Sequence, residues 1–184
     1  MIRFFLILVL LIFLSFIFQL YIPPMIFLKG AAILFTPALL FYGSLALPFP
    51  LVLVLVFLAG LWNDLLTVPR SSGHSDYTIG TSIILYLIPA LIIHGLRPLF
   101  IKKGWGVHLM LAELAAILSP FCLLAQYAIL SFERSDFFFS DVIVWRILGP
   151  GLIAMVTTPF VFLFLSSISH LLGYQPRAEG TKLR

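Results

Sequence analysis

The sequence predicts an all-α integral membrane protein, a polytopic bundle of transmembrane helices. Hydrophobic residues make up 62% of the chain and charged residues only 10%, whereas soluble domains have about 45–50% apolar and about 25% charged residues. The mean hydropathy of +1.17 agrees with this contrast. The apolar runs lack the period-two alternation of membrane β-strands. A helix also satisfies its backbone hydrogen bonds within one segment, which the bilayer requires.

The number of spans follows from the lengths of the apolar runs, because a spanning helix needs about 20 residues. The charge-free stretch from Gly30 to Asn63 is too long for one ordinary span, and Pro48-Phe49-Pro50 breaks it. If this stretch were one kinked helix, the chain would have five spans. With the break, we expect six transmembrane helices, over residues 4–22, 31–47, 51–66, 79–96, 107–130 and 147–172. They form one domain, 1–172, followed by a polar tail, 173–184.

The distribution of Lys and Arg predicts the orientation of the chain. With six spans, one side carries seven cations, Arg3, Arg97, Lys102, Lys103, Arg177, Lys182 and Arg184. The other side carries four, Lys29, Arg70, Arg134 and Arg146. The positive-inside rule then places both termini in the cytoplasm. With five spans the N-terminus would move outside, but the C-terminal tail would remain cytoplasmic.

Asp64 lies at the end of the third expected span, in the sequence Gly60-Leu-Trp-Asn-Asp. Two interpretations remain open. The carboxylate could be solvated at the membrane edge, with Trp62 as an interface anchor. Alternatively, Asn63 and Asp64 could orient the following loop or hold a partner, with Gly60 letting another backbone approach closely.

Glu113 lies about two turns into the fifth expected span. Intramembrane carboxylates are costly and are candidates for function. Glu113 could be protonated, could pair with Arg97 or His94, or could have a proton or ion role, although no second intramembrane acid appears to form a relay. Ala112 and Ala116 form a stripe of small residues beside it, which suits close helix packing.

The residues of catalysis and cofactor binding are missing from the sequence. The single cysteine allows no disulfide or Cys-based metal motif within the chain. The histidines lack the H-E-x-x-H spacing, and no glycine-rich phosphate loop is present. The net charge of +4 is not gathered into a basic patch interleaved with aromatic residues, so nucleic-acid binding is disfavoured. We therefore expect no enzymatic activity and no cofactor.

The stretch from Gly60 to Phe100 resembles the bacterial rod shape-determining MreD family. That family has a Gly, three residues, an Asp followed by apolar residues, a short loop, a Gly, and an apolar span containing a Tyr. The matching positions here are Gly60, Asp64-Leu65-Leu66, Gly80, and Ile83 to Leu91 with Tyr86. One departure is the link between Asp64 and Gly80, which is lengthened by a segment from Pro69 to Asp76.

The resemblance implies a non-enzymatic scaffold in the bacterial cytoplasmic (inner) membrane. Such a scaffold binds a bitopic MreC-like protein and, indirectly, MreB filaments and peptidoglycan synthases, and so maintains cell shape during cell-wall elongation. The expected partners are therefore membrane lipids and this bitopic protein. The scaffold would recognise the bitopic protein by helix-to-helix packing. The candidate residues for partner binding or structure are Gly60, Trp62, Asn63, Asp64, Gly80, Ala112, Glu113 and Ala116.

The family also looks distantly like the substrate-binding subunits of energy-coupling-factor transporters. The alternative function is therefore a small-molecule-binding membrane subunit of such a transporter. It would need a few convergent polar groups in a mostly apolar pocket. The candidates for these groups are Gln126, Glu113, Thr81, Ser82 and Thr157.

Overall fold

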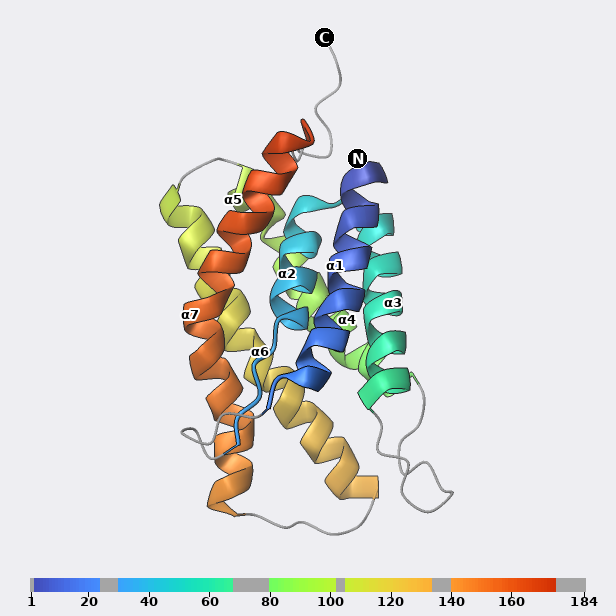
Figure 1. Ribbon diagram of the computed structural model, residues 1–184, viewed down its shortest axis with the longest axis vertical. Coiled ribbons are helices and arrows are strands. Elements are labelled where there is room, and N and C mark those ends of the chain that lie inside the picture. The colour runs from blue at the N-terminus through green and yellow to red at the C-terminus, as the bar shows by residue number, and fades with distance from the viewer. Residues whose placement is uncertain (1, 24–29, 68–79, 102–104, 134–139, 175–184) are drawn as a thin grey trace.

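The computed structural model describes residues 2–23, 30–67, 80–101, 105–133 and 140–174, and its fold is all-helical (Figure 1). The helices are α1 (Ile2–Tyr21), α2 (Thr36–Ala46), α3 (Phe49–Thr67), α4 (Thr81–Gly95), α5 (Arg97–Ile101), α6 (Trp105–Glu133) and α7 (Asp141–Leu171). The predicted fold class, a helical membrane protein, agrees with this architecture.

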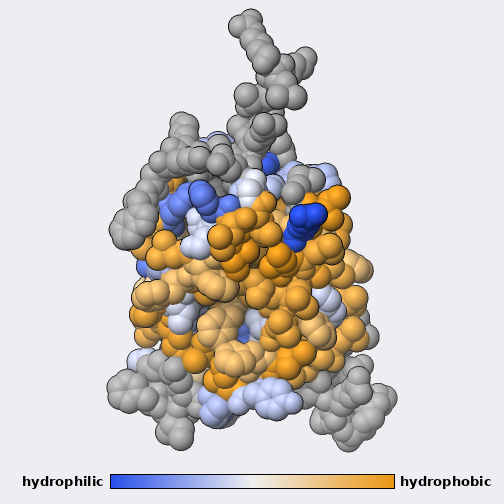
Figure 2. Space-filling view, turned by 45° about the horizontal axis from the view of Figure 1, so that its top comes forward, coloured by the Kyte–Doolittle hydropathy of each residue, from blue (hydrophilic) through white to orange (hydrophobic). Residues whose placement is uncertain are grey.

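Within the described segments, four helices are long and apolar enough to cross a bilayer: Ile2–Tyr21, Phe49–Leu66, Val107–Ile129 and Ile143–Leu171. Helix α4 has 15 residues and α2 has 11, both shorter than the roughly 20 of a full span. On the face seen in Figure 2, hydrophobic side chains form a broad band, and polar residues gather toward the two ends. The chain is therefore embedded in a membrane through apolar helices.

The second expected span differs most from the structure. We expected a helix over 31–47, but residues 32–35 are not helical and α2 begins at Thr36. Pro37 lies in the first turn of α2. A proline costs least at this place in a helix, because its missing N–H would have no partner there. The stretch expected to be the second span is thus a short helix preceded by non-helical chain.

The other boundaries differ less. The structure has helices at 2–21, 49–67, 81–95, 105–133 and 141–171, where we expected 4–22, 51–66, 79–96, 107–130 and 147–172. The loop expected at 97–106 begins with the short helix α5. The largest extension is at α7, which begins after Ser140, whose backbone is extended, and has Asp141 in its first turn. A carboxylate there is favoured by the positive end of the helix dipole.

Helix α2 lies at the centre of the bundle and contacts α1, α3, α4, α6 and α7 (Figure 1). All 11 of its residues are buried. The long helices around it bury only one face each. Helix α1, for example, buries Phe4, Leu8 and Ile12 and exposes Leu6 and Leu10. The i, i+4 spacing of the buried set is that of one helix face, and the opposite face is available to lipid.

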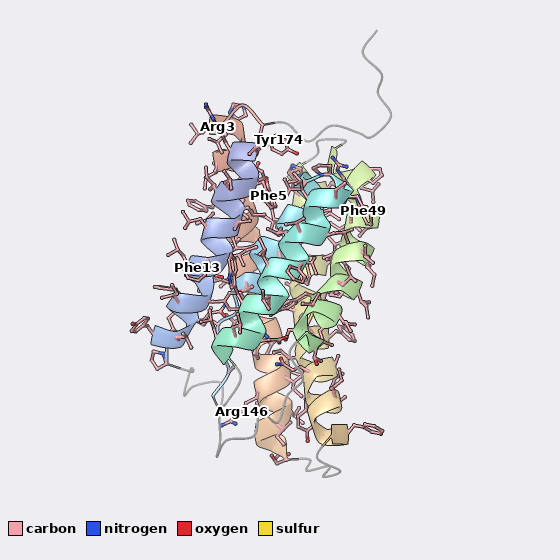
Figure 3. All side chains as sticks on the ribbon, turned by 90° about the vertical axis from the view of Figure 1, so that its right-hand side faces the viewer. Arg3, Phe5, Phe13, Phe49, Arg146 and Tyr174 are labelled. Carbon is pink, nitrogen blue, oxygen red and sulfur yellow. The ribbon has the colours of Figure 1, made fainter. Side chains whose placement is uncertain are left out.

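The two ends of the described chain meet. The rings of Phe4 and Tyr174 are stacked with their centroids 5.0 Å apart, so the start of α1 and the end of α7 lie at one end of the bundle (Figure 1). Arg3 and Tyr174 lie toward this end and Arg146 lies toward the other (Figure 3). Arg3 and Arg146 thus lie toward opposite ends of the bundle. Of the other cations used in that prediction, Arg97 begins α5, and the rest lie outside the described residues.

Candidate functional site

Gly60 marks the closest approach between α3 and α4. A Cβ atom added at this position would lie 2.5 Å from the Cα atom and 2.6 Å from the backbone nitrogen of Ile83. A backbone atom cannot move aside as a flexible side chain can, so only glycine fits here. The close backbone approach predicted for Gly60 is therefore made, and it is made to a helix of the same chain.

Asp64 connects the same two helices one turn further along. Its side chain is only 3% exposed, so it is not a solvated residue at the membrane edge. Its Oδ2 atom accepts a hydrogen bond of 2.6 Å from the backbone N–H of Gly80. Gly80 has a left-handed φ of 107° and occupies the N-cap position of α4. The carboxylate thus satisfies an N–H at the start of α4, where the helix dipole also favours a negative charge.

Asn63 and Trp62 complete this joint. The Nδ2 atom of Asn63 donates to Ser82 Oγ at 2.7 Å, so a second side chain of α3 binds the first turn of α4. The Trp62 ring packs against Phe13 of α1, with the ring centroids 5.1 Å apart. We call the contacts that Gly60, Asn63 and Asp64 make with residues 80–83, at the start of α4, the α3–α4 joint. It brings together predicted site residues that are far apart in sequence, and it orients α4 relative to α3.

Ala112 and Ala116 are fully buried, so the small-residue stripe is covered by helices of the same chain. Glu113 between them is half-buried. Among the residues that the structure describes, Glu113 makes no hydrogen bond or ion pair, and the pairing with Arg97 or His94 considered above is not formed. His94 instead contacts α2, and Arg97 is buried at 6% exposure.

The C-terminal end of α2 is held by side chains from distant parts of the chain. The last carbonyls of a helix have no partner within the helix. Here His94 Nδ1 lies 2.7 Å from the carbonyl oxygen of Ser44, and the Tyr174 hydroxyl donates to that of Ala46 at 2.9 Å. Burial raises the pKa of Tyr174 above its usual 10.0, and nearby Arg97 acts in the opposite direction. The phenol is therefore protonated, as a donor must be, at all physiological pH values.

The N-terminal end of α2 is held by α1. With its amide oriented so that the oxygen accepts, Gln19 binds the backbone N–H groups of Phe35 and Thr36, at 2.8 Å and 3.2 Å. The Thr36 and Ser15 hydroxyls are 2.8 Å apart. Ser15 gives its own proton to the carbonyl oxygen of Ile12, so Thr36 is the donor of this bond. Gln19 thus replaces the side-chain cap that Phe35, at the N-cap position, cannot provide.

A cavity of about 330 Å³ lies beside this N-terminal end. Helices α1, α2, α3, α4 and α6 and the chain before α2 all contribute to its wall. It is lined by Gln19, Leu34, Thr36, Pro37, Asn63, Ser82, Leu85, Tyr86, Ser119, Cys122, Leu123 and Gln126. We call it the polar cavity. None of these residues is an acid, a lysine, an arginine or a histidine.

The sequence identified this cavity only in part. Ser82 and Gln126 were among the polar candidates for a pocket and line it. Glu113, Thr81 and Thr157 were candidates too, but they are not in its wall. Gln19 and Ser119 were missed, because a single polar residue in an apolar run gives no periodic signal. The only sign was that each is a polar residue within a membrane span, where such residues are costly.

Two further hollows are apolar. One of about 480 Å³ lies between α6 and α7 and includes Pro120 and Gly151. The other, of about 520 Å³, lies between α1 and α7 over Phe35 and Leu39. In the described part of the chain, no group of three His, Cys, Asp or Glu side chains is arranged to hold a metal ion.

Comparison with protein families, with curated proteins and with solved structures finds no match to this chain.

Proposed function

We propose that this chain is a non-enzymatic scaffold of the bacterial cell-elongation complex, similar to MreD, in the cytoplasmic membrane. The observation that carries the proposal is the α3–α4 joint. The residues of the MreD-like pattern, Gly60, Asp64 and Gly80, come from α3 and from the start of α4 and meet in this joint. The joint supplies a physical reason for this pattern. Gly60 makes room for the backbone of Ile83, Asp64 accepts the hydrogen bond from Gly80, and the left-handed φ of Gly80 favours glycine.

The proposal includes six crossings with both termini in the cytoplasm. The stacking of Phe4 on Tyr174 supports it, because an even number of crossings brings the two ends of a chain to the same side. Helix α2 rises about 16 Å at 1.5 Å per residue. The five residues 31–35 can add up to about 16 Å at roughly 3.3 Å each. Together they are long enough for the roughly 30 Å hydrocarbon core.

The buried positions of the small residues refine the mechanism of the scaffold. Gly60, Ala112 and Ala116 contact the chain's own helices. In the proposed complex they shape the bundle, and the single span of a bitopic MreC-like partner packs on the outward apolar faces. Lipid tails are as apolar as the side chains, so the hydrophobic effect does not drive helices together within a bilayer. Such packing relies instead on van der Waals contact and lipid entropy.

The test is complementation of a depletion strain of the rod-shaped host. Depletion should turn rods into round cells, and the wild-type gene should restore rods. Asp64→Ala should fail to restore them, since it removes the bond to Gly80 and leaves an N–H of α4 unsatisfied at a cost of about 1–3 kcal/mol.

The matched control is Ser167→Ala, at an exposed polar position of α7 outside the MreD-like pattern, which should restore rods. Membrane levels of both variants are compared by immunoblot. Cells that keep a normal rod shape after complete deletion of the gene would refute the scaffold function.

A second candidate is the small-molecule-binding subunit of an energy-coupling-factor-type transporter. The polar cavity favours it, because it is a pocket with a few convergent polar groups in a mostly apolar bundle. The genomic neighbourhood separates the two candidates. A neighbouring gene for an energy-coupling ATPase supports the transporter subunit, whereas a gene for a bitopic periplasmic coiled-coil protein supports the scaffold.

A further inference from the structure

We propose that the polar cavity is a binding site for an uncharged, hydrogen-bonding small molecule. The proposal does not rest on the scaffold function. It adds to the second candidate, the transporter subunit, by naming the class of its ligand. Ligand binding alone tests it.

The size of the cavity suits a small ligand. Its volume of about 330 Å³ is at the lower end of the roughly 300–1,000 Å³ of small-molecule pockets. At about 30 Å³ per molecule in the liquid, the same space corresponds to roughly eleven water molecules. A ligand of one ring with polar substituents fits this space, and a lipid chain or a large cofactor does not.

Gln126 is the strongest reason to expect a hydrogen-bonding ligand. It faces the polar cavity from α6, and its amide makes no hydrogen bond to any described residue. An amide offers two donors and an acceptor. Leaving these unused within a membrane protein costs free energy, which a polar occupant recovers.

Ser119, about two helical turns before Gln126, adds an acceptor. The residue is 2% exposed, and its hydroxyl donates its proton to the carbonyl oxygen of Ala115 at 3.1 Å. The oxygen lone pairs remain for a donor in the cavity. On the opposite wall, Asn63 and Ser82 present an amide and a hydroxyl already bonded to each other. The walls therefore offer both donors and acceptors.

The ligand is expected to be uncharged because the described part of the cavity wall offers no charge to pair with an ion. Among the lining residues that the structure describes, none is an acid, a lysine, an arginine or a histidine. Asp64 is next to Asn63 in sequence, but it is not in the wall, and its Oδ2 is bound to Gly80. Moving an unpaired ion into such an environment costs several kcal/mol. An isosteric neutral molecule avoids this cost.

The backbone at this end of α2 agrees with a site. Non-helical chain at membrane depth occurs where it is buried in protein or lines a polar cavity. Leu34, in the non-helical chain before α2, and Thr36 and Pro37, in its first turn, all line the polar cavity. The non-helical chain before α2 therefore lies beside the polar cavity.

The test uses a matched pair of probes, nicotinamide and its isosteric carboxylate nicotinate, with the full chain in lipid nanodiscs. Binding is followed by saturation-transfer-difference NMR of the probe. Nicotinamide should bind saturably to the wild type, and nicotinate should bind at least tenfold more weakly. Small molecules released from the protein purified from its own membranes are identified in parallel by mass spectrometry.

Two variants localise the binding. Ser119→Phe fills the cavity and should weaken nicotinamide binding at least tenfold. Gln126→Leu keeps the size of the side chain and should weaken it about two- to tenfold, the range for one lost hydrogen bond. The matched control is Ser167→Phe on the exposed side of α7, where the serine also donates to its own helix, at Leu163. It should bind like the wild type.

Three results would overturn the proposal. Nicotinate could bind as tightly as nicotinamide, which would indicate an anion site. Ser119→Phe could bind nicotinamide as the wild type does, which would place binding in lipid or elsewhere on the protein. Finally, neither probe could bind, and mass spectrometry could find no uncharged compound that is released from the wild type and missing from Ser119→Phe. The cavity would then hold water alone. Cell shape after depletion tests the scaffold function and is independent of these three binding results.

Discussion

The two ends of α2 are stabilised in opposite ways. At the C-terminal end, Tyr174 and His94 bind carbonyl groups of the helix directly, and the Tyr174 ring is stacked on Phe4. At the N-terminal end, Gln19 binds two backbone N–H groups, but the adjoining space is the polar cavity. One end is closed by packed aromatic side chains, and the other borders a cavity lined by polar groups.

This difference shows how a short helix can occupy the centre of a membrane bundle. With 11 residues, α2 has few internal hydrogen bonds, and most of its stability must come from tertiary contacts. The closed C-terminal end fixes its position. The N-terminal end is then free to border a cavity without unfolding the helix. Substitutions should therefore reduce stability most at the C-terminal end.

The largest effect is expected for Gly43→Leu, in the last turn of α2. A Cβ atom there would lie 2.5 Å from methyl groups of both Leu8 and Leu55, and a leucine adds three more carbons. Overpacking of this kind costs about 1–3 kcal/mol or more, so little monodisperse protein should survive detergent extraction, as measured by fluorescence-detected size exclusion. Gly95→Leu is the control, because nothing lies within 4 Å of its Cβ position. Equal yields for the two variants would contradict the tight packing.

An intermediate effect is expected for Tyr174→Phe. The ring can still stack on Phe4, but the carbonyl of Ala46 loses its hydrogen bond, and a buried unsatisfied group costs about 1–3 kcal/mol. The apparent melting temperature in detergent should fall. Tyr21→Phe, at an 82% exposed position, should leave it unchanged. A Tyr174→Phe protein as stable as the wild type would mean that the C-terminal end is not closed by this bond.

The smallest effect is expected for Thr36→Val at the N-terminal end. The change preserves shape and removes the bond from Thr36 to Ser15. Ser15 still donates to Ile12, so only one hydrogen bond is lost, and the loss should be about 0.5–1.5 kcal/mol. The melting temperature should fall less than in Tyr174→Phe. A larger fall would reverse the comparison between the two ends of α2.

Much of the fold was predictable because membrane helices are recognised by length and apolar composition alone. A proline is typical of the first turn of a helix, so Thr36-Pro37 indicated where α2 begins. The apolar residues before it nevertheless favoured a longer helix. The role of Asp64 was predictable as one of two alternatives, since an acid before a loop can bind the next helix. Which alternative held depended on the fold.

The contacts that close α2 could not be predicted from local patterns. Tyr174 and Ala46 are 128 residues apart, and His94 and Ser44 are 50 apart. Tyr174 belongs to the stretch expected to be a polar tail, and only the packing of α7 against α2 brings it to the helix end. The polar cavity depends in the same way on five helices whose arrangement no single segment encodes.

The most direct test of the scaffold function is to identify the proteins that co-purify with this chain from host membranes in mild detergent, by quantitative mass spectrometry. The proposal predicts a protein with a single span and a periplasmic coiled coil, present in near-equal amount and depleted in the Asp64→Ala pull-down relative to Ser167→Ala. A pull-down that contains an energy-coupling ATPase and no such single-span protein would contradict the scaffold function and support the transporter subunit.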